Sequence, residues 1–115
     1  MAGIVFFKTE ALAALEDFYT RRLGMRVWLR QTDCTILQHG NLLLGFCARS
    51  VLEKPGVITF FYESREEVDA MHNDLRDIAE GSPAENAKYR IYQFFAHDPE
   101  GRLLEFQCFL HPVEM

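Results

Sequence analysis

One stretch near the end of the chain decides the fold: Asp98-Pro99-Glu100-Gly101-Arg102-Leu103-Leu104-Glu105-Phe106-Gln107. Its opening Asp-Pro-Glu-Gly is a strong turn signal, because Asp bonds its own backbone, Pro pre-sets φ and Gly tolerates a positive φ. The turn lies between residues 89–97 and 103–109, which are both rich in aromatic and branched side chains. We therefore predict a β-hairpin in which Gly101 has positive φ, Asp98 pairs with Arg102, and His97 lies opposite Leu103.

This register gives the hairpin two different faces. One is nearly all apolar and should pack against helices: Tyr92, Phe94, Ala96, Leu104, Phe106 and Cys108. The other mixes apolar and polar residues and suits a cavity wall: Ile91, Gln93, Phe95, His97, Leu103, Glu105, Gln107 and Phe109. Glu105 is the residue to explain on that face, because burying an unpaired carboxylate costs on the order of several kcal/mol.

Length and composition restrict the class of protein. With 115 residues, 49% of them hydrophobic and 25% charged, the chain suits one globular, soluble domain with a core of its own. A net charge of −5 without a Lys/Arg cluster argues against a nucleic-acid partner, and the short apolar runs argue against a membrane span or signal peptide. The three cysteines, Cys34, Cys47 and Cys108, form no Cys-x-x-Cys motif, so we expect buried free thiols in a reducing cytoplasm.

The order of predicted elements repeats. We expect a strand at 3–9, a helix at 11–23 and strands at 25–31, 34–38 and 42–48, then a strand at 56–62 and a helix from Ser64 to near Gly81. Ser64 and Glu67 form a capping box at the start of that helix. A loop at 82–87, with room for a short edge strand, leads into the hairpin. Glycine-led segments repeat as well: 3–7 parallels 56–60, and 40–47 parallels 101–108, which places Leu44 at the position of Glu105.

Motifs in both halves are similar to those of one known superfamily: Phe18-Tyr19 with Leu23-Gly24, Glu66-Glu67-Val68-Asp69, and Asp98-Pro99-Glu100-Gly101 with Leu104-Glu105-Phe106. On these residues the whole chain resembles the vicinal oxygen chelate superfamily, which includes glyoxalase I, bleomycin-resistance proteins and extradiol dioxygenases. The resemblance implies an α+β fold of two βαβββ modules, here residues 1–52 and 53–115 of a single domain. It also implies that the modules form a half-open, barrel-like cup, usually within a homodimer.

The resemblance further implies where a metal would bind. In the metal-dependent members, ligands come from the first and last strands of each module, positions that correspond here to Ile4, Leu44, Val57 and Glu105. Only Glu105 has a side chain that can coordinate a cation, and one carboxylate falls short of the four to six donors that Zn²⁺, Fe²⁺ or Mg²⁺ need. No cofactor is predicted, and the donor set argues against a divalent metal.

The remaining candidate residues are aromatic or lie near the hairpin end. We expect Phe6, Phe46, Phe61 and Phe95 to face the cup. They form either an apolar ligand pocket around a single polar group, Glu105, or part of the hydrophobic core. Trp28, expected on one face with Arg26 and Arg30, either lines the cup or covers a sheet face or dimer seam. The predicted ligand-binding set is Glu105, Gln107, His97, Phe95, Phe61, Phe46, Phe6 and Trp28, with no catalytic residue identified.

Two of these side chains have alternative roles. Glu105 is either a relic acid bonded to a neighbour such as Gln93, Gln107 or Lys8, or an anchor for a cationic or hydroxyl group, or a base in a dry cup. His97 either pairs with Glu105 or lies in solvent at the hairpin end.

Three functions follow from these observations. The leading hypothesis is a metal-independent protein that sequesters an aromatic or hydrophobic small molecule, and the net negative charge favours a cationic one. The second is a divalent-metal-dependent lyase, isomerase or dioxygenase with a displaced metal site around Glu105, completed by His97, His39 or a partner chain. The third is an interaction module without a ligand, because fold alone does not determine function. A second copy of the chain is the expected protein partner.

Overall fold

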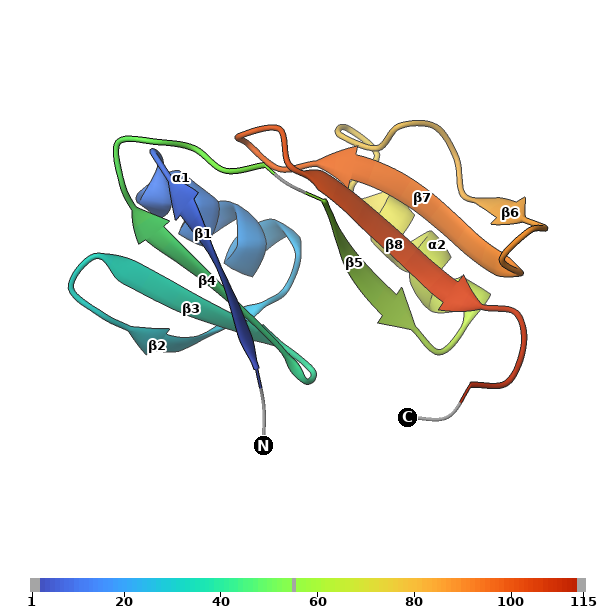
Figure 1. The fold of residues 1–115 in the computed structure, drawn as a ribbon. Helices are drawn as coiled ribbons and strands as arrows, with labels where there is room; N and C mark the ends of the chain where they lie inside the picture. The colour runs from blue at the N-terminus through green and yellow to red at the C-terminus, as the bar shows by residue number, and fades with distance from the viewer. Residues whose placement is uncertain (1–2, 55, 114–115) are drawn as a thin grey trace. The chain divides into compact units, whose positions relative to one another are not determined.

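The computed structural model describes residues 3–54 and 56–113. The chain divides into two compact units, Met1–Pro55 and Gly56–Met115, each with one four-stranded sheet that carries its helix on one face (Figure 1). The fold is therefore α+β with two βαβββ modules, as predicted. We call the face of a sheet that is turned away from its own helix the open face.

The two units have the same topology. The first contains β1 (Ile4–Thr9), α1 (Leu12–Asp17), the π-helical segment η1 (Phe18–Arg22), β2 (Arg26–Arg30), β3 (Cys34–His39) and β4 (Leu42–Ala48). The second contains β5 (Val57–Tyr62), α2 (Arg65–Asp74), β6 (Ala84–Asn86), β7 (Ile91–His97) and β8 (Leu103–Phe109). The strand orders are β1-β4-β3-β2 and β5-β8-β7-β6, with the first and last strands of each unit parallel neighbours.

The core of the second unit lies between its sheet and α2. Phe106 stacks on Phe60 and Phe94, with ring centroids 5.4 and 4.8 Å apart, and Val68 and Leu75 from the helical side are fully buried. Burial of each such side chain contributes about 1.5–3 kcal/mol.

The capping box predicted for α2 is confirmed for its Ser64 half, while Glu67 bonds the backbone N–H of Glu63, one residue before the N-cap. The Ser64 hydroxyl oxygen accepts the Glu67 N–H at 3.2 Å, and Glu67 Oε1 accepts from the Glu63 N–H and the Ser64 hydroxyl. The helix ends at Asp74, earlier than expected, and turns follow it through residue 78. The predicted edge strand is present as β6.

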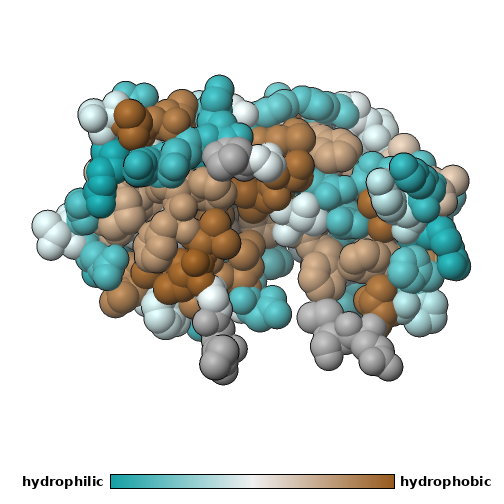
Figure 2. Space-filling model, in the orientation of Figure 1, coloured by the Kyte–Doolittle hydropathy of each residue, from teal (hydrophilic) through white to brown (hydrophobic). Residues whose placement is uncertain are grey.

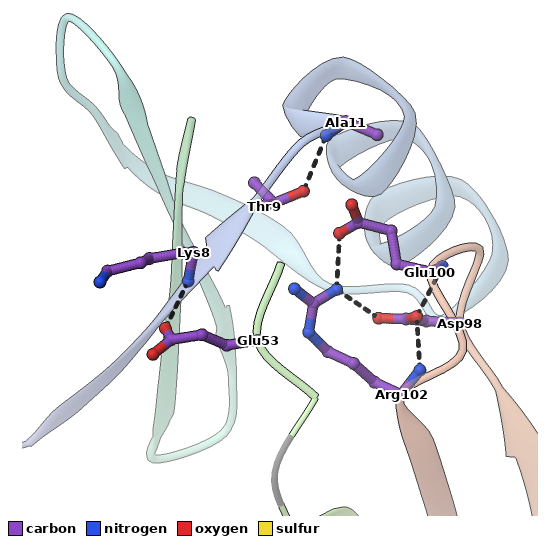
Figure 3. Close-up of polar contacts among 7 residues, drawn as sticks. All are labelled: Lys8, Thr9, Ala11, Glu53, Asp98, Glu100 and Arg102. Atoms are coloured by element: carbon purple, nitrogen blue, oxygen red, sulfur yellow. Dashed lines mark hydrogen bonds and ion pairs between the residues drawn. The ribbon is translucent and has the colours of Figure 1, made fainter. Parts of the chain in front are cut away.

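The predicted hairpin is confirmed with its register. Phe95 lies opposite Glu105 and His97 opposite Leu103, Gly101 has φ +86°, and the Asp98 N–H donates to the Arg102 carbonyl at 3.0 Å. Figure 3 shows how the turn is held: Asp98 Oδ1 accepts two backbone N–H groups at 2.9 Å, and the buried Arg102 guanidinium contacts Asp98 and Glu100. A buried, fully hydrogen-bonded carboxylate therefore fixes this end of the hairpin.

In the first unit, side chain and connector contacts hold the ends of β1. The Lys8 N–H donates to Glu53 Oε1 at 2.8 Å, which ties the connector after β4 to this strand (Figure 3). Thr9 Oγ1 accepts the Ala11 N–H at 2.9 Å immediately before α1. The first-unit core packs Tyr19 on Phe46, with ring centroids 5.0 Å apart.

The expectation that Phe46 faces the cup, on the same side of the sheet as Phe6, is wrong. Phe46 is 1% exposed and lies on the helix side of the sheet, where it packs on Tyr19. The strand registers explain the error. Ile4 of β1 pairs with Leu43, and Val57, the equivalent residue of β5, pairs with Leu103. Leu43 therefore corresponds to Leu103, and Gly45 rather than Leu44 corresponds to Glu105. The internal repeat read from the sequence is one residue out of register.

The expected alternation of β2 is also wrong. The strand has a bulge at Trp28, where the pairing shifts between Val27 and Leu29, so Arg26 and Arg30 lie on opposite faces. Arg30 reaches toward the helix side and pairs with Glu16 of α1 at 2.8 Å.

The prediction of three free thiols fails for two of them. Cys34 and Cys47 lie directly opposite each other on β3 and β4 and form a disulfide, with Cα atoms 4.1 Å apart, while Cys108 is free and buried. Cross-strand partners on one face have Cβ atoms close enough for such a bond.

Within the described ranges 3–54 and 56–113, none of the helices has the length and apolar character that a membrane span requires.

Candidate ligand pocket on the second sheet

A pocket of about 500 Å³ lies on the open face of the second sheet. Its lining comes from β5, β6, β7, β8 and the turn before β7: Val57, Asn86, Tyr89, Ile91, Gln93, Phe95, Glu105, Gln107 and Phe109. Strand alternation produces this wall, because Phe94 and Phe106 face α2 whereas Phe95 and Glu105 face the opposite way. The volume is in the range of pockets that hold small organic molecules.

Glu105 is the one charged residue in this lining. Thr59 lies beside it in the parallel register of β5 and β8 and donates its hydroxyl to Glu105 Oε1 at 2.9 Å. Gln107 Nε2 donates to the same oxygen at 3.3 Å. Of the alternatives for Glu105, bonding to Gln107 is confirmed, while Thr59 is a partner that the sequence did not suggest.

Gln107 carries an acceptor that nothing in the described chain satisfies. Its Oε1 is buried and has no hydrogen-bond partner, while its Nε2 is used by Glu105. A buried polar atom without a partner costs free energy, and such atoms are rare in folded proteins. This oxygen therefore marks the place where a donor from a ligand would be stabilised.

Apart from Asn86 and Gln93, aromatic and aliphatic side chains form the rest of the wall. Tyr89, Val57 and Phe109 are 59%, 49% and 36% exposed, so much apolar area in this unit faces outward. Asn86 holds the turn that carries Tyr89, because its Oδ1 accepts the N–H groups of Lys88 and Tyr89 at 3.1 and 3.3 Å.

Three residues predicted as ligand-binding line the pocket: Glu105, Gln107 and Phe95. Phe61 packs on Phe109, with ring centroids 5.6 Å apart, beside an adjoining hollow. His97 contributes nothing to the lining and does not pair with Glu105. Its Nδ1 lies 2.9 Å from Glu80 Oε1 instead.

The other predicted residues, Phe6, Phe46 and Trp28, belong to the first unit and are not part of this lining. Figure 2 shows apolar side chains gathered over the first unit, where Ile4, Val5 and Phe6 of β1 are exposed. The pocket residues that sequence reasoning missed, Asn86 and Tyr89, come from other elements than the hairpin strands, as does Val57, which was considered only as an implied metal-ligand position. Only the tertiary arrangement brings them to Glu105.

The donor set does not fit a divalent metal. With the corrected register, the four positions implied for ligands hold Ile4, Gly45, Val57 and Glu105, of which three offer no side-chain donor. Over residues 3–54 and 56–113, no three His, Cys, Asp or Glu side chains gather in a group that could hold a metal ion. We therefore derive no chemistry through a metal.

The fold and this site define a class: the chain has the glyoxalase/bleomycin-resistance fold. An integron cassette protein from the mobile metagenome of the Halifax Harbour sewage outfall superimposes with a TM-score of 0.81 at 19% identity, over 95% of this chain and 98% of that one. A glyoxalase/bleomycin resistance protein/dioxygenase family enzyme from Burkholderia phytofirmans gives 0.79 at 20% identity, over 93% and 97%.

A lactoylglutathione lyase from Agrobacterium tumefaciens gives a TM-score of 0.76 at 18% identity, over 94% of this chain and 92% of that one. Neither a sequence-family model nor a curated protein matches the chain. At these identities the structural likenesses establish the fold and leave the activity to be argued from the site.

Proposed function

We propose that this protein binds a small aromatic or hydrophobic molecule in the pocket of its second unit, without a metal, and so sequesters it. The observation that carries the proposal is the pocket itself, which joins a mostly apolar wall to a single carboxylate that is already positioned by Thr59 and Gln107. Apolar pockets with a few fixed polar groups are the usual form of small-molecule sites. The net charge of −5 favours a cationic guest.

The proposal is tested by direct binding in the presence of a chelator. Calorimetric titration with three naphthalene probes, 2-naphthylmethylamine, 2-naphthylmethanol and 2-naphthoate, covers a cation, a neutral molecule and an anion of similar shape. We expect the amine to bind in EDTA with micromolar to low millimolar affinity and the naphthoate to bind weakest. No binding by any probe would overturn the proposal, as would binding that needs added Zn²⁺, Mn²⁺ or Fe²⁺.

A matched pair of variants locates the binding. Phe109→Ala removes a half-exposed aromatic wall of the pocket and should weaken binding about tenfold. Trp28→Ala removes an aromatic side chain of similar exposure at the bulge of β2 and should leave the affinity unchanged. The opposite result would move the binding site to the first unit.

We also propose that the protein forms a homodimer. The support is apolar exposure on the edge strand β1, where Ile4, Val5 and Phe6 are 36%, 52% and 48% exposed. Edge strands with exposed apolar side chains are surfaces that proteins usually cover. Light scattering at micromolar concentration should give twice the mass of one chain, and the mass of one chain would contradict the proposal.

A further inference from the structure

The polar groups of the pocket have a pattern that restricts the ligand further. Two neighbouring donors, the Thr59 hydroxyl and Gln107 Nε2, both bond to Glu105 Oε1. Glu105 Oε2 receives no hydrogen bond from the described residues, and Gln107 Oε1 is buried without a partner. The polar atoms that lack a hydrogen-bond partner at this place are therefore acceptors.

We infer that the pocket recognises an organic cation that carries at least two N–H donors, such as a primary ammonium or an amidinium attached to an aromatic or apolar group. One N–H bonds Glu105 Oε2 and a second bonds Gln107 Oε1, while the apolar part lies against Phe95 and Phe109. This inference rests on the proposed function and adds the chemical class of the ligand.

Charge and donor geometry contribute separately. The Glu105 carboxylate attracts any cation, but the buried Gln107 oxygen gains only from a true hydrogen-bond donor. A quaternary ammonium has the charge and no N–H, so it would leave Gln107 Oε1 as unsatisfied as it is in the free protein. A neutral alcohol has one donor and no charge.

The side chain of Gln107 is fixed in the orientation that the inference needs. Its amide nitrogen must point toward the Glu105 carboxylate, because an amide oxygen placed there would face another acceptor. The Oε1 atom is then the end that remains for a ligand. Gln93 lies opposite Gln107 across β7 and β8 and also lines the pocket, but it makes no hydrogen bond to Gln107.

The test compares 2-naphthylmethylamine with its N,N,N-trimethyl analogue, by calorimetry, on the full chain. The primary amine should bind at least tenfold more tightly, since a hydrogen bond between a charged donor and a buried acceptor changes affinity by about that factor or more. In Gln107→Leu this preference should fall to less than threefold, because the acceptor is gone.

Thr59→Val is the matched control. It removes a donor to Glu105 Oε1 without removing an acceptor, so the preference for the primary amine should persist even if both affinities fall. Glu105→Gln should weaken both cations at least tenfold. Circular dichroism of each variant shows whether it is folded.

Each outcome decides the inference. The ammonium assignment is overturned if the wild type binds the primary amine and its trimethyl analogue with equal affinity, or if it binds 2-naphthylmethanol as tightly as the amine. The proposed binding function stands in both cases. A preference that survives in Gln107→Leu overturns the role of Gln107. If no naphthalene probe binds at all, the proposed function itself fails and the inference fails with it.

Discussion

The two units share one framework, yet three equivalent positions on their open faces differ completely. The registers place Cys34, Cys47 and Gly45 of the first unit where the second unit has Gln93, Gln107 and Glu105. In the first unit a disulfide joins two of these positions and the third has no side chain. In the second unit the same positions carry the polar groups of the pocket. At these three positions the framework thus tolerates either a disulfide or a group of polar side chains.

A second difference reinforces the first. Phe6 of β1 corresponds to Thr59 of β5, and its ring lies over Gly45, where an added Cβ would be 2.4 Å from Phe6 Cδ1. Thr59 instead bonds Glu105. An aromatic ring over a glycine thus replaces a hydroxyl bonded to an acid.

The largest effect is expected from the hairpin turns of the two units. Asp98→Ala removes a buried carboxylate that holds two backbone N–H groups and the buried Arg102, so it should lower the free energy of unfolding by about 3 kcal/mol or more. Asn41→Ala, at the exposed turn between β3 and β4, should change it by less than about 0.5 kcal/mol. Urea unfolding measures both, and equal losses would show that the two turns are held alike.

The disulfide should give the next largest effect. Replacing Cys34 and Cys47 together by Ala should lower the free energy of unfolding by about 2–3 kcal/mol, because the bond closes a loop of 13 residues. A reductant should lower the melting temperature of the wild type and leave that of the double variant unchanged. A wild-type melting temperature insensitive to reductant would contradict the bond.

A smaller effect is expected with pH at the end of the first hairpin. Burial lowers the pKa of His39 below its ordinary value of 6.5, so folding favours the neutral imidazole. The stability that this group contributes is complete above pH 6.5 and is lost as the pH falls through its folded pKa. His39→Gln should flatten the stability profile below pH 6.5, while His97→Gln, at the end of the second hairpin, serves as the comparison. An unchanged slope in His39→Gln would contradict the assignment.

The smallest effect is spectroscopic. Tyr62 of β5 stands where β1 has Thr9, and burial, with a smaller contribution from Glu67, raises its pKa to about 12. Its contribution to stability is therefore present below pH 10 and lost as the pH rises from 10 to 12. The tyrosinate absorbance that develops near pH 12 should be smaller in Tyr62→Phe than in the wild type, with a remainder from Tyr92, whose pKa is raised by its hydrogen bond to Asp69. A step of unchanged size in that variant would assign it to another tyrosine.

Much of the fold was predictable because its signals are local. The Asp-Pro-Glu-Gly turn fixed the register of β7 and β8, and the Ser64–Glu67 capping box fixed the start of α2. The face that carries Glu105 and Gln107 followed from strand alternation alone. These features depend on neighbours in sequence, so sequence reasoning reaches them.

The errors arose where the answer depends on distant strands. The turn at Gly40-Asn41 is shorter than the turn at 98–102, so aligning the two glycines displaced the first unit by one residue and put Phe46 on the wrong face. The disulfide depends on the pairing of β3 with β4, and Thr59 meets Glu105 only through the pairing of β5 with β8. The expected cytoplasmic location relied on free thiols, so the disulfide removes that support.

The close approach of Phe6 to Gly45 also constrains how the first unit could change over generations. A side chain at residue 45 requires that the ring of Phe6 first move or be replaced, so a substitution at 45 alone meets a penalty that it would not meet in a chain with a small residue at 6. A path toward a second acid like Glu105 is therefore easier when a smaller residue at 6 precedes the change at 45. The cost of a side chain at 45 thus depends on which residue stands at 6.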